Sequence, residues 1–148
     1  MSPVEIREAT DTDVPDLLGA YREAGIDGGL AFTVQEARQQ FARFRDYPSY
    51  RFFVARVDGA FAGTYALIIL DNLAKRGTKA GVVEDVAVLP AFQGRGVGRA
   101  MMEHARAECR AAACYKMTLS SNLAREGAHA FYDSLGFQRH GYSFLVNP

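Results

Sequence analysis

The segment QGRGVGRAMM, residues 93–102, constrains the fold more than any other part of the sequence. Glycines stand at positions 94, 96 and 98, and a run of good helix formers follows them. Glycine permits backbone dihedrals that other residues avoid, and it leaves neighbouring peptide N–H groups accessible. At the start of a helix, those N–H groups and the helix dipole attract anions. The segment predicts a phosphate-binding turn between a strand and a helix, with a purely structural glycine-rich turn as the alternative.

Three kinds of phosphate-binding loop can be compared with this segment. A P-loop needs Lys and then Ser or Thr after its last glycine, but Arg99 and Ala100 follow Gly98. A dinucleotide fingerprint needs a third glycine where this chain has Arg99 or Met101, and it follows the first strand of its fold. A loop for the pyrophosphate of coenzyme A is the remaining hypothesis.

Hydrophobic periodicity and turn residues predict one domain over residues 1–148, in which strands and helices alternate. Strands are predicted over residues 4–7, 51–57, 61–70, 81–89, 115–120 and 137–146. Helices are predicted from about 14 to 24, 34 to 45, 97 to 112 and 122 to 135, with Thr33 and Asn122 as caps. Strands joined by hairpins pair antiparallel, and strands joined across a helix more often pair parallel. The fold class is therefore α/β (α+β) with a mixed sheet.

Composition argues against several functional classes. Lys+Arg and Asp+Glu both number 17, so no net charge favours nucleic acid or a membrane surface as a partner. No apolar run is long enough to span a bilayer, and the first residues, MSPVEIREAT, lack a signal-peptide pattern. Cys109 and Cys114 do not form a C-x-x-C or metal-binding pattern. We expect a cytoplasmic protein with reduced thiols and no metal site.

Two segments resemble the GNAT superfamily of N-acetyltransferases. Residues 84–99, EDVAVLPAFQGRGVGR, are similar to its acetyl-CoA motif, [RQ]-x-x-G-x-[GA], at Gln93, Gly96 and Gly98. Residues 128–137, AHAFYDSLGF, resemble the A-x-x-F-Y-x-x-x-G-F segment of the family. The element order also fits, so the resemblance covers the whole chain. It implies a mixed, mostly antiparallel sheet flanked by about four helices, with the small-molecule amine branch as the closer match.

The resemblance implies that acetyl-CoA is the cosubstrate, without a metal, and that the acetyl group passes to a primary amine by direct attack through a tetrahedral intermediate. In the family the strand before the glycine loop bulges, and its backbone pairs with the pantetheine arm as an added strand would. An N–H near Val86 to Ala87 would face the thioester oxygen. The residues implied in acetyl-CoA binding are Val86, Ala87, Val88, Gln93, Gly94, Arg95, Gly96, Val97, Gly98, Arg99, Asn122 and Tyr132.

Two residues are predicted to be catalytic. Tyr132 matches the family position for an acid that protonates the departing thiolate, although it can also be a packed helical side chain. Glu84 stands two residues before Val86, so alternation along a strand predicts both on one side and Asp85 on the other. Glu84 can then act as the base for the amine, directly or through water, or it can be a solvated strand end. His129 is a second candidate base.

The amine acceptor is less clearly marked. The loop with Lys75, Arg76 and Lys79 favours a phosphorylated or carboxylated amine, or is simply solvated. The acceptor cleft can also draw on four aromatic residues that otherwise pack in the core: Tyr21, Phe32, Tyr47 and Tyr50. The alternatives to a small-molecule enzyme are acetylation of a protein N-terminus or lysine, a non-catalytic acyl-CoA-binding module, and binding of another nucleotide. The apolar segment 142–146 leaves a homodimer open.

Overall fold

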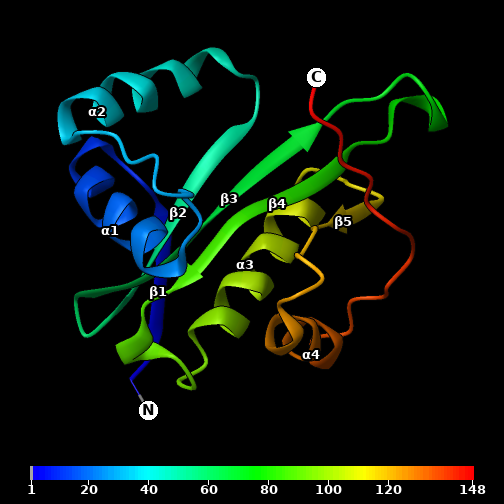
Figure 1. Cartoon of the computed structure of the whole chain (residues 1–148). Coiled ribbons are helices and arrows are strands. Elements are labelled where there is room, and N and C mark those ends of the chain that lie inside the picture. Colours follow the sequence, from blue (N-terminus) through cyan, green and yellow to red (C-terminus); the bar gives the residue numbers. More distant parts are fainter. Residues whose placement is uncertain (1) are drawn as a thin grey trace. The chain divides into compact units, whose positions relative to one another are not determined.

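The computed structural model describes residues 2–148, which contain five strands and four α-helices (Figure 1). The chain divides into two compact units, one that ends at Thr118 and one over Leu119–Pro148. The prediction of one domain over residues 1–148 stays a prediction. No helix in the described residues is long and apolar enough to cross a membrane.

The first unit is built on one five-stranded sheet. Its strands, in the order in which they lie side by side, are β1 (Val4–Glu8), β2 (Tyr50–Val57), β3 (Ala60–Leu70), β4 (Ala80–Val88) and β5 (Lys116–Thr118). The pairs from β1 to β4 are antiparallel, whereas β4 and β5 are parallel. The turn between β2 and β3 has positive φ at Asp58 and Gly59, as a tight hairpin requires. The predicted mixed, mostly antiparallel sheet is confirmed.

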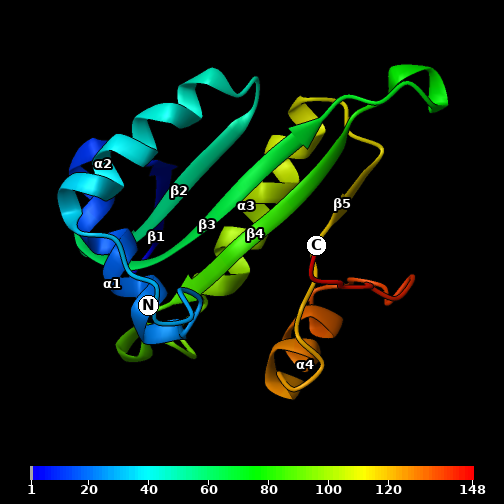
Figure 2. The ribbon, with the colours of Figure 1, turned by 45° about the horizontal axis from the view of Figure 1, so that its top comes forward.

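Helices cover both faces of this sheet (Figure 2). One face carries α1 (Val14–Ala24) and α2 (Val34–Arg43), and the other carries α3 (Val97–Ala111). The cap predicted at Thr33 is confirmed, because its hydroxyl accepts the Glu36 N–H at 3.2 Å while the Glu36 carboxylate accepts the Thr33 N–H at 2.9 Å. This capping box fixes the start of α2.

The helices seal two apolar layers. On the α1 and α2 face, Leu17 packs with Phe52, Val54 and Ala66. On the opposite face, α3 buries Val97, Met101, Met102, Ala105 and Cys109. There the buried Tyr65 hydroxyl lies 2.7 Å from His104 Nδ1. Burial of these layers supplies the main driving force for folding of the unit.

The second unit holds α4 (Glu126–Ser134). The prediction that this helix starts at Asn122 is wrong, because the Asn122 side-chain oxygen instead accepts the Ala124 N–H at 2.9 Å in a turn. The predicted strand over 137–146 is also wrong, and Phe144 there is 93% exposed. A strand needs a neighbour for its backbone groups, and no described residue pairs with this segment. The strand predicted over 115–120 is shorter than expected, at Lys116–Thr118.

Candidate functional site

Strand β4 contains a bulge directly before the glycine loop. Along its pairing with β3, Ala66 lies opposite Glu84, but Thr64 lies opposite Ala87. One residue of β3, Tyr65, therefore faces two residues of β4. Asp85 takes up the extra length with a φ of 51°. The strand thus bulges as the family resemblance implies.

The bulge decides which side chains share a face of the sheet. Residues opposite each other on antiparallel strands point to the same face, so Glu84 lies with Ala66 on the α1 and α2 side. Asp85 lines a pocket on that same side. The prediction that Glu84 and Val86 share a face, with Asp85 on the other, is wrong, because the extra residue breaks strict alternation. The neighbouring carboxylates of Glu84 and Asp85 therefore lie on the same face of the sheet.

The edge of β4 is open over most of its length. Strand β5 pairs with β4 only at Ala80, Gly81 and Val82. From Val83 to Val88, no strand lies on that side of β4 among the residues that the structure describes. An unpaired strand edge presents a row of N–H and C=O groups that can pair with an extended ligand. The backbone of Val86, Ala87 and Val88 belongs to this open edge.

The glycine loop lies between β4 and α3. Gly94 has a φ of 72°, and Gly96, the N-cap of α3, has a φ of 80°. A Cβ built on either glycine meets nothing within 4 Å, so the backbone dihedral demands glycine while the space above the loop stays open. No described backbone group accepts a hydrogen bond from the N–H of Gly94, Arg95 or Gly96. Loop and helix start together present free N–H groups of the kind that bind anions in other proteins.

Side chains around the loop add charge and fix its position. The Arg95 guanidinium carbon lies 5.0 Å from the centre of the Phe92 ring, with the charge exposed to solvent. The Gln93 amide donates to the Val88 carbonyl at 3.4 Å, so the loop contacts the end of β4. Val97, Gly98 and Arg99 form the first turn of α3, whose N–H groups lack partners within the helix.

The two carboxylates of β4 have unusual electrostatics. Burial raises the pKa of Asp85, and burial together with the Asp85 charge raises the pKa of Glu84. Burial also raises the pKa of Tyr21 and Tyr50, and the charge of Asp85 adds to both effects. A carboxylate whose pKa moves toward neutrality is a better proton acceptor. Glu84 and Asp85 are therefore suited to accept a proton or to bind a cation.

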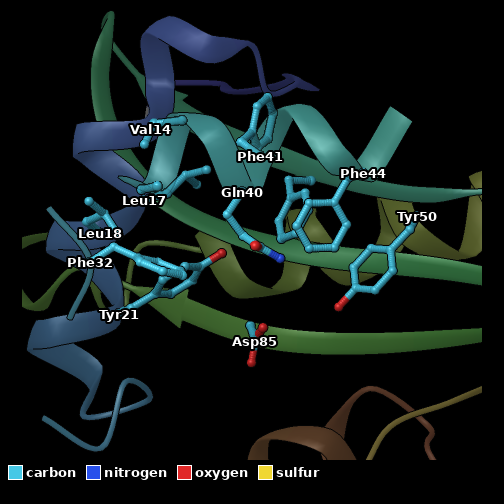
Figure 3. Close-up of a pocket in the computed structure, with 12 residues that line it drawn as sticks. Val14, Leu17, Leu18, Tyr21, Phe32, Gln40, Phe41, Phe44, Tyr50 and Asp85 are labelled. Carbon is cyan, nitrogen blue, oxygen red and sulfur yellow. The ribbon is translucent and has the colours of Figure 1, made fainter. Parts of the chain in front are cut away.

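Next to the bulge lies a pocket of about 260 Å³ (Figure 3). Its walls come from α1, α2, β2 and the segment before α2, and Asp85 contributes from β4. The lining residues are Val14, Leu17, Leu18, Tyr21, Phe32, Ala37, Gln40, Phe41, Phe44, Tyr50, Phe52 and Asp85. Of the aromatic residues singled out in the sequence, Tyr47 alone is outside the lining, and its ring packs on Phe44 and Tyr50. Sequence alternation missed Asp85, although the bulge expected from the family was a signal for it.

The remaining predicted residues lie in the second unit. Tyr132 on α4 packs against Phe131 and Phe137, with ring centres 5.2 and 5.5 Å away. Burial raises the pKa of Tyr132. His129 Nε2 lies 2.8 Å from the Asn122 carbonyl, so that nitrogen carries the hydrogen. The roles of Tyr132, His129 and Asn122 stay predictions.

Comparison with known proteins agrees with this geometry. A family model described as "Acetyltransferase (GNAT) family" matches residues 20–137. The chain is 30% identical over 140 residues to a glucosamine 6-phosphate N-acetyltransferase from Trypanosoma brucei brucei, covering 93% of this chain and 90% of the relative. It is 26% identical over 144 residues to an aminoalkylphosphonate N-acetyltransferase from Salmonella typhimurium, covering 97% and 91%.

A solved structure from Agrobacterium tumefaciens str. C58 superposes with a TM-score of 0.89 at 33% identity, covering 97% of this chain and 99% of that chain. The family match spans well over half of the sequence, and its relatives align along nearly the whole chain. The resemblance found in the two motifs is thereby confirmed. The chain belongs to the GNAT family of acetyltransferases and is an acyltransferase.

Proposed function

We propose that the protein transfers the acetyl group of acetyl-CoA to the primary amine of a small molecule. The observation that most supports this function is the open edge of β4 from Val83 to Val88, which leads directly into the exposed N–H groups of the glycine loop. An extended amide-containing arm with an anionic end matches both features. Inorganic phosphate alone would need the loop and not the edge.

The residues present fit acetyl-CoA. The N–H groups from Gly94 to Arg99 would hold the pyrophosphate, and Arg95 and Arg99 would add positive charge. The backbone of Val86 and Val88 would pair with the pantetheine amides. When bound, acetyl-CoA supplies an acetyl group activated as a thioester. A backbone N–H near Val86 to Ala87 would stabilise developing negative charge, worth about 3 kcal/mol of the barrier.

The side chains of the chain move the protons. Glu84 would take a proton from the acceptor ammonium, because an ammonium has no lone pair for attack. The amine nitrogen would then attack the thioester carbonyl carbon to give a tetrahedral intermediate, and the carbon–sulfur bond would break as that intermediate collapses to the amide. Tyr132 would give its proton to the departing thiolate. Because a tyrosine, with a pKa of about 10, is a weaker acid than a thiol, at about 8.5, the second proton released by the new amide nitrogen would return to the tyrosinate and complete the transfer. Glu84 would release the first proton to solvent. The products are an amide and free coenzyme A.

Two observations favour a small acceptor. The relatives named above act, by their names, on glucosamine 6-phosphate and on aminoalkylphosphonates, both small amines. The pocket beside the bulge has about 260 Å³, below the ~300–1,000 Å³ typical of drug-sized ligands. A small amine fits there more readily than a folded protein surface.

The test is release of free thiol from acetyl-CoA in the presence of amines. The panel covers amino sugars and their phosphates, aminophosphonates, arylalkylamines, polyamines, amino acids and lysine peptides. Turnover with a small amine is the expected result. Turnover confined to peptides would refute the small-molecule acceptor. Coenzyme A binding without turnover of any amine would favour a binding module, and absence of coenzyme A binding would refute the assignment of the glycine loop.

A further inference from the structure

The pocket beside the bulge has an unusual balance of apolar and charged groups. Six of its twelve lining residues are aromatic: Tyr21, Phe32, Phe41, Phe44, Tyr50 and Phe52. Four more are aliphatic, and Gln40 is the neutral polar member. Asp85 is the single charged residue of the lining, and no lysine, arginine or histidine belongs to it. The site therefore offers one negative charge against an aromatic wall.

The aromatic wall is rigid. Phe44 meets Tyr50 and Phe52 edge to face, with ring centres 4.6 and 4.8 Å apart. Tyr50 stacks on Phe52 at 5.4 Å. Such a packed cluster is preformed and presents ring faces to a ligand at little entropic cost. A flat or compact apolar body is the complementary shape.

Asp85 stands where the charged end of a ligand would lie. Asp85 lines the pocket and lies below Gln40 and the aromatic rings in Figure 3. No described residue forms a hydrogen bond or an ion pair with it, and burial alone accounts for the raised pKa of Asp85. A half-buried carboxylate without a partner favours a ligand cation. Asp85 also adjoins Val86, whose backbone would hold the thioester arm.

The basic loop does not serve this pocket. Lys75 and Arg76 lie in the short turn Lys75–Gly77 between β3 and β4 (Figure 1). The Lys75 ammonium nitrogen lies 5.3 Å from the centre of the Tyr115 ring. Neither Lys75 nor Arg76 belongs to the pocket lining. A phosphate on an acceptor in this pocket would meet no cationic side chain, because the lining contains none.

We infer that the acceptor of this enzyme is a primary amine on a compact aromatic or apolar body, an arylalkylamine in chemical terms, and that Asp85 binds its ammonium group. Phosphorylated and phosphonylated amines should bind less tightly, because the lining offers no cationic side chain to their phosphate or phosphonate group. This inference rests on the proposed function and differs from what the names of the relatives would suggest. It also separates two roles: Asp85 positions the amine, and Glu84 takes its proton.

A binding measurement tests the inference independently of turnover. By titration calorimetry, 2-phenylethylamine should bind the protein more tightly than glucosamine 6-phosphate or 2-aminoethylphosphonate. Asp85→Asn should weaken binding of 2-phenylethylamine by about tenfold or more, since a charge-assisted bond is lost. The uncharged analogue 2-phenylethanol should bind both proteins equally. Asparagine tolerates the positive φ of Asp85, so the bulge should survive, and thermal unfolding checks this.

Two further variants keep the test sharp. Glu84→Gln should leave the affinity for 2-phenylethylamine within about twofold while lowering turnover, because its role is proton transfer. Lys75→Ala should change neither the affinity nor the order of acceptors. Tighter binding of glucosamine 6-phosphate, or unchanged affinity in Asp85→Asn, overturns the inference even if thiol is released. Tight binding of the arylalkylamine without thiol release would uphold the ammonium-binding role of Asp85 and count against the proposed function.

Discussion

Gly63 on β3 gives a direct test of how tightly the bulged strand is packed. A Cβ added there would lie 2.7 Å from the Ala87 carbonyl oxygen and 3.4 Å from the Met101 sulfur. The methionine can move, but the carbonyl belongs to the backbone of β4 and resists displacement. Overpacking of this kind costs about 1–3 kcal/mol. The loss of backbone freedom in the unfolded chain returns about 0.4–1 kcal/mol.

Gly63→Ala should therefore destabilise the protein by about 1–2 kcal/mol, which lowers Tm by about 2–8 °C for a chain of this size. Gly19→Ala is the matched control, because Gly19 lies inside α1 and a Cβ there meets nothing within 4 Å. The same chemical change should stabilise α1 by about 0.5–1 kcal/mol.

Urea and thermal unfolding measure whether each variant is less stable or more stable than the unmodified protein. The affinity for coenzyme A should also fall in Gly63→Ala and not in Gly19→Ala, because the displaced Ala87 carbonyl shares a peptide group with the Val88 N–H on the open edge. If Gly63→Ala proves as stable as Gly19→Ala, the close approach of β3 to the bulge is refuted. If Gly63→Ala is destabilised but its coenzyme A affinity is unchanged, the proposed role of the β4 edge in coenzyme A binding is refuted.

Three other predictions concern the loop, the acid and the fold. Gly96→Asp should abolish coenzyme A binding in calorimetry, because it places a negative charge beside the pyrophosphate. Gly96→Ala adds only the strain of a left-handed backbone, ~1–2 kcal/mol, and should bind coenzyme A more weakly. An equal loss of affinity in both variants would refute the explanation by charge repulsion. Tyr132→Phe should lower kcat more than coenzyme A affinity, and unchanged kcat would exclude Tyr132 from the mechanism. Asp13→Asn should cost about 1.5–3 kcal/mol at pH 7, because the arginine partners of the buried Asp13 carboxylate hold its pKa low. The folded-state pKa of Asp13 lies below its unfolded value, so the ionised carboxylate stabilises the folded protein above about pH 4 and this contribution is lost as the pH falls. The difference in unfolding free energy between the unmodified protein and Asp13→Asn should therefore narrow below about pH 4, and a difference that stays constant would refute the ion-pair explanation.

Much of the first unit could be predicted from local sequence. Thr33 and Glu36 specify a capping box, Asp58 and Gly59 specify a tight turn, and the apolar spacing of Val97 to Cys109 specifies the buried face of α3. Each depends on dihedral preferences or periodicity within a few residues. The wrong predictions in the second unit arise because its structure depends on contacts with distant residues. The segment 137–146 has strand-forming residues, but a strand forms only when another edge accepts its backbone.

The glycine loop is what the sequence determined by itself. Positive φ at Gly94 and Gly96 and the start of α3 follow from residues adjacent in the chain. The faces of Glu84 and Asp85 were decided only by tertiary structure, because the register between β3 and β4 places the extra residue opposite Tyr65. The pocket likewise exists only where α1, α2 and the sheet meet. Periodicity is a local property, whereas register and cavities arise from distant segments that pack together.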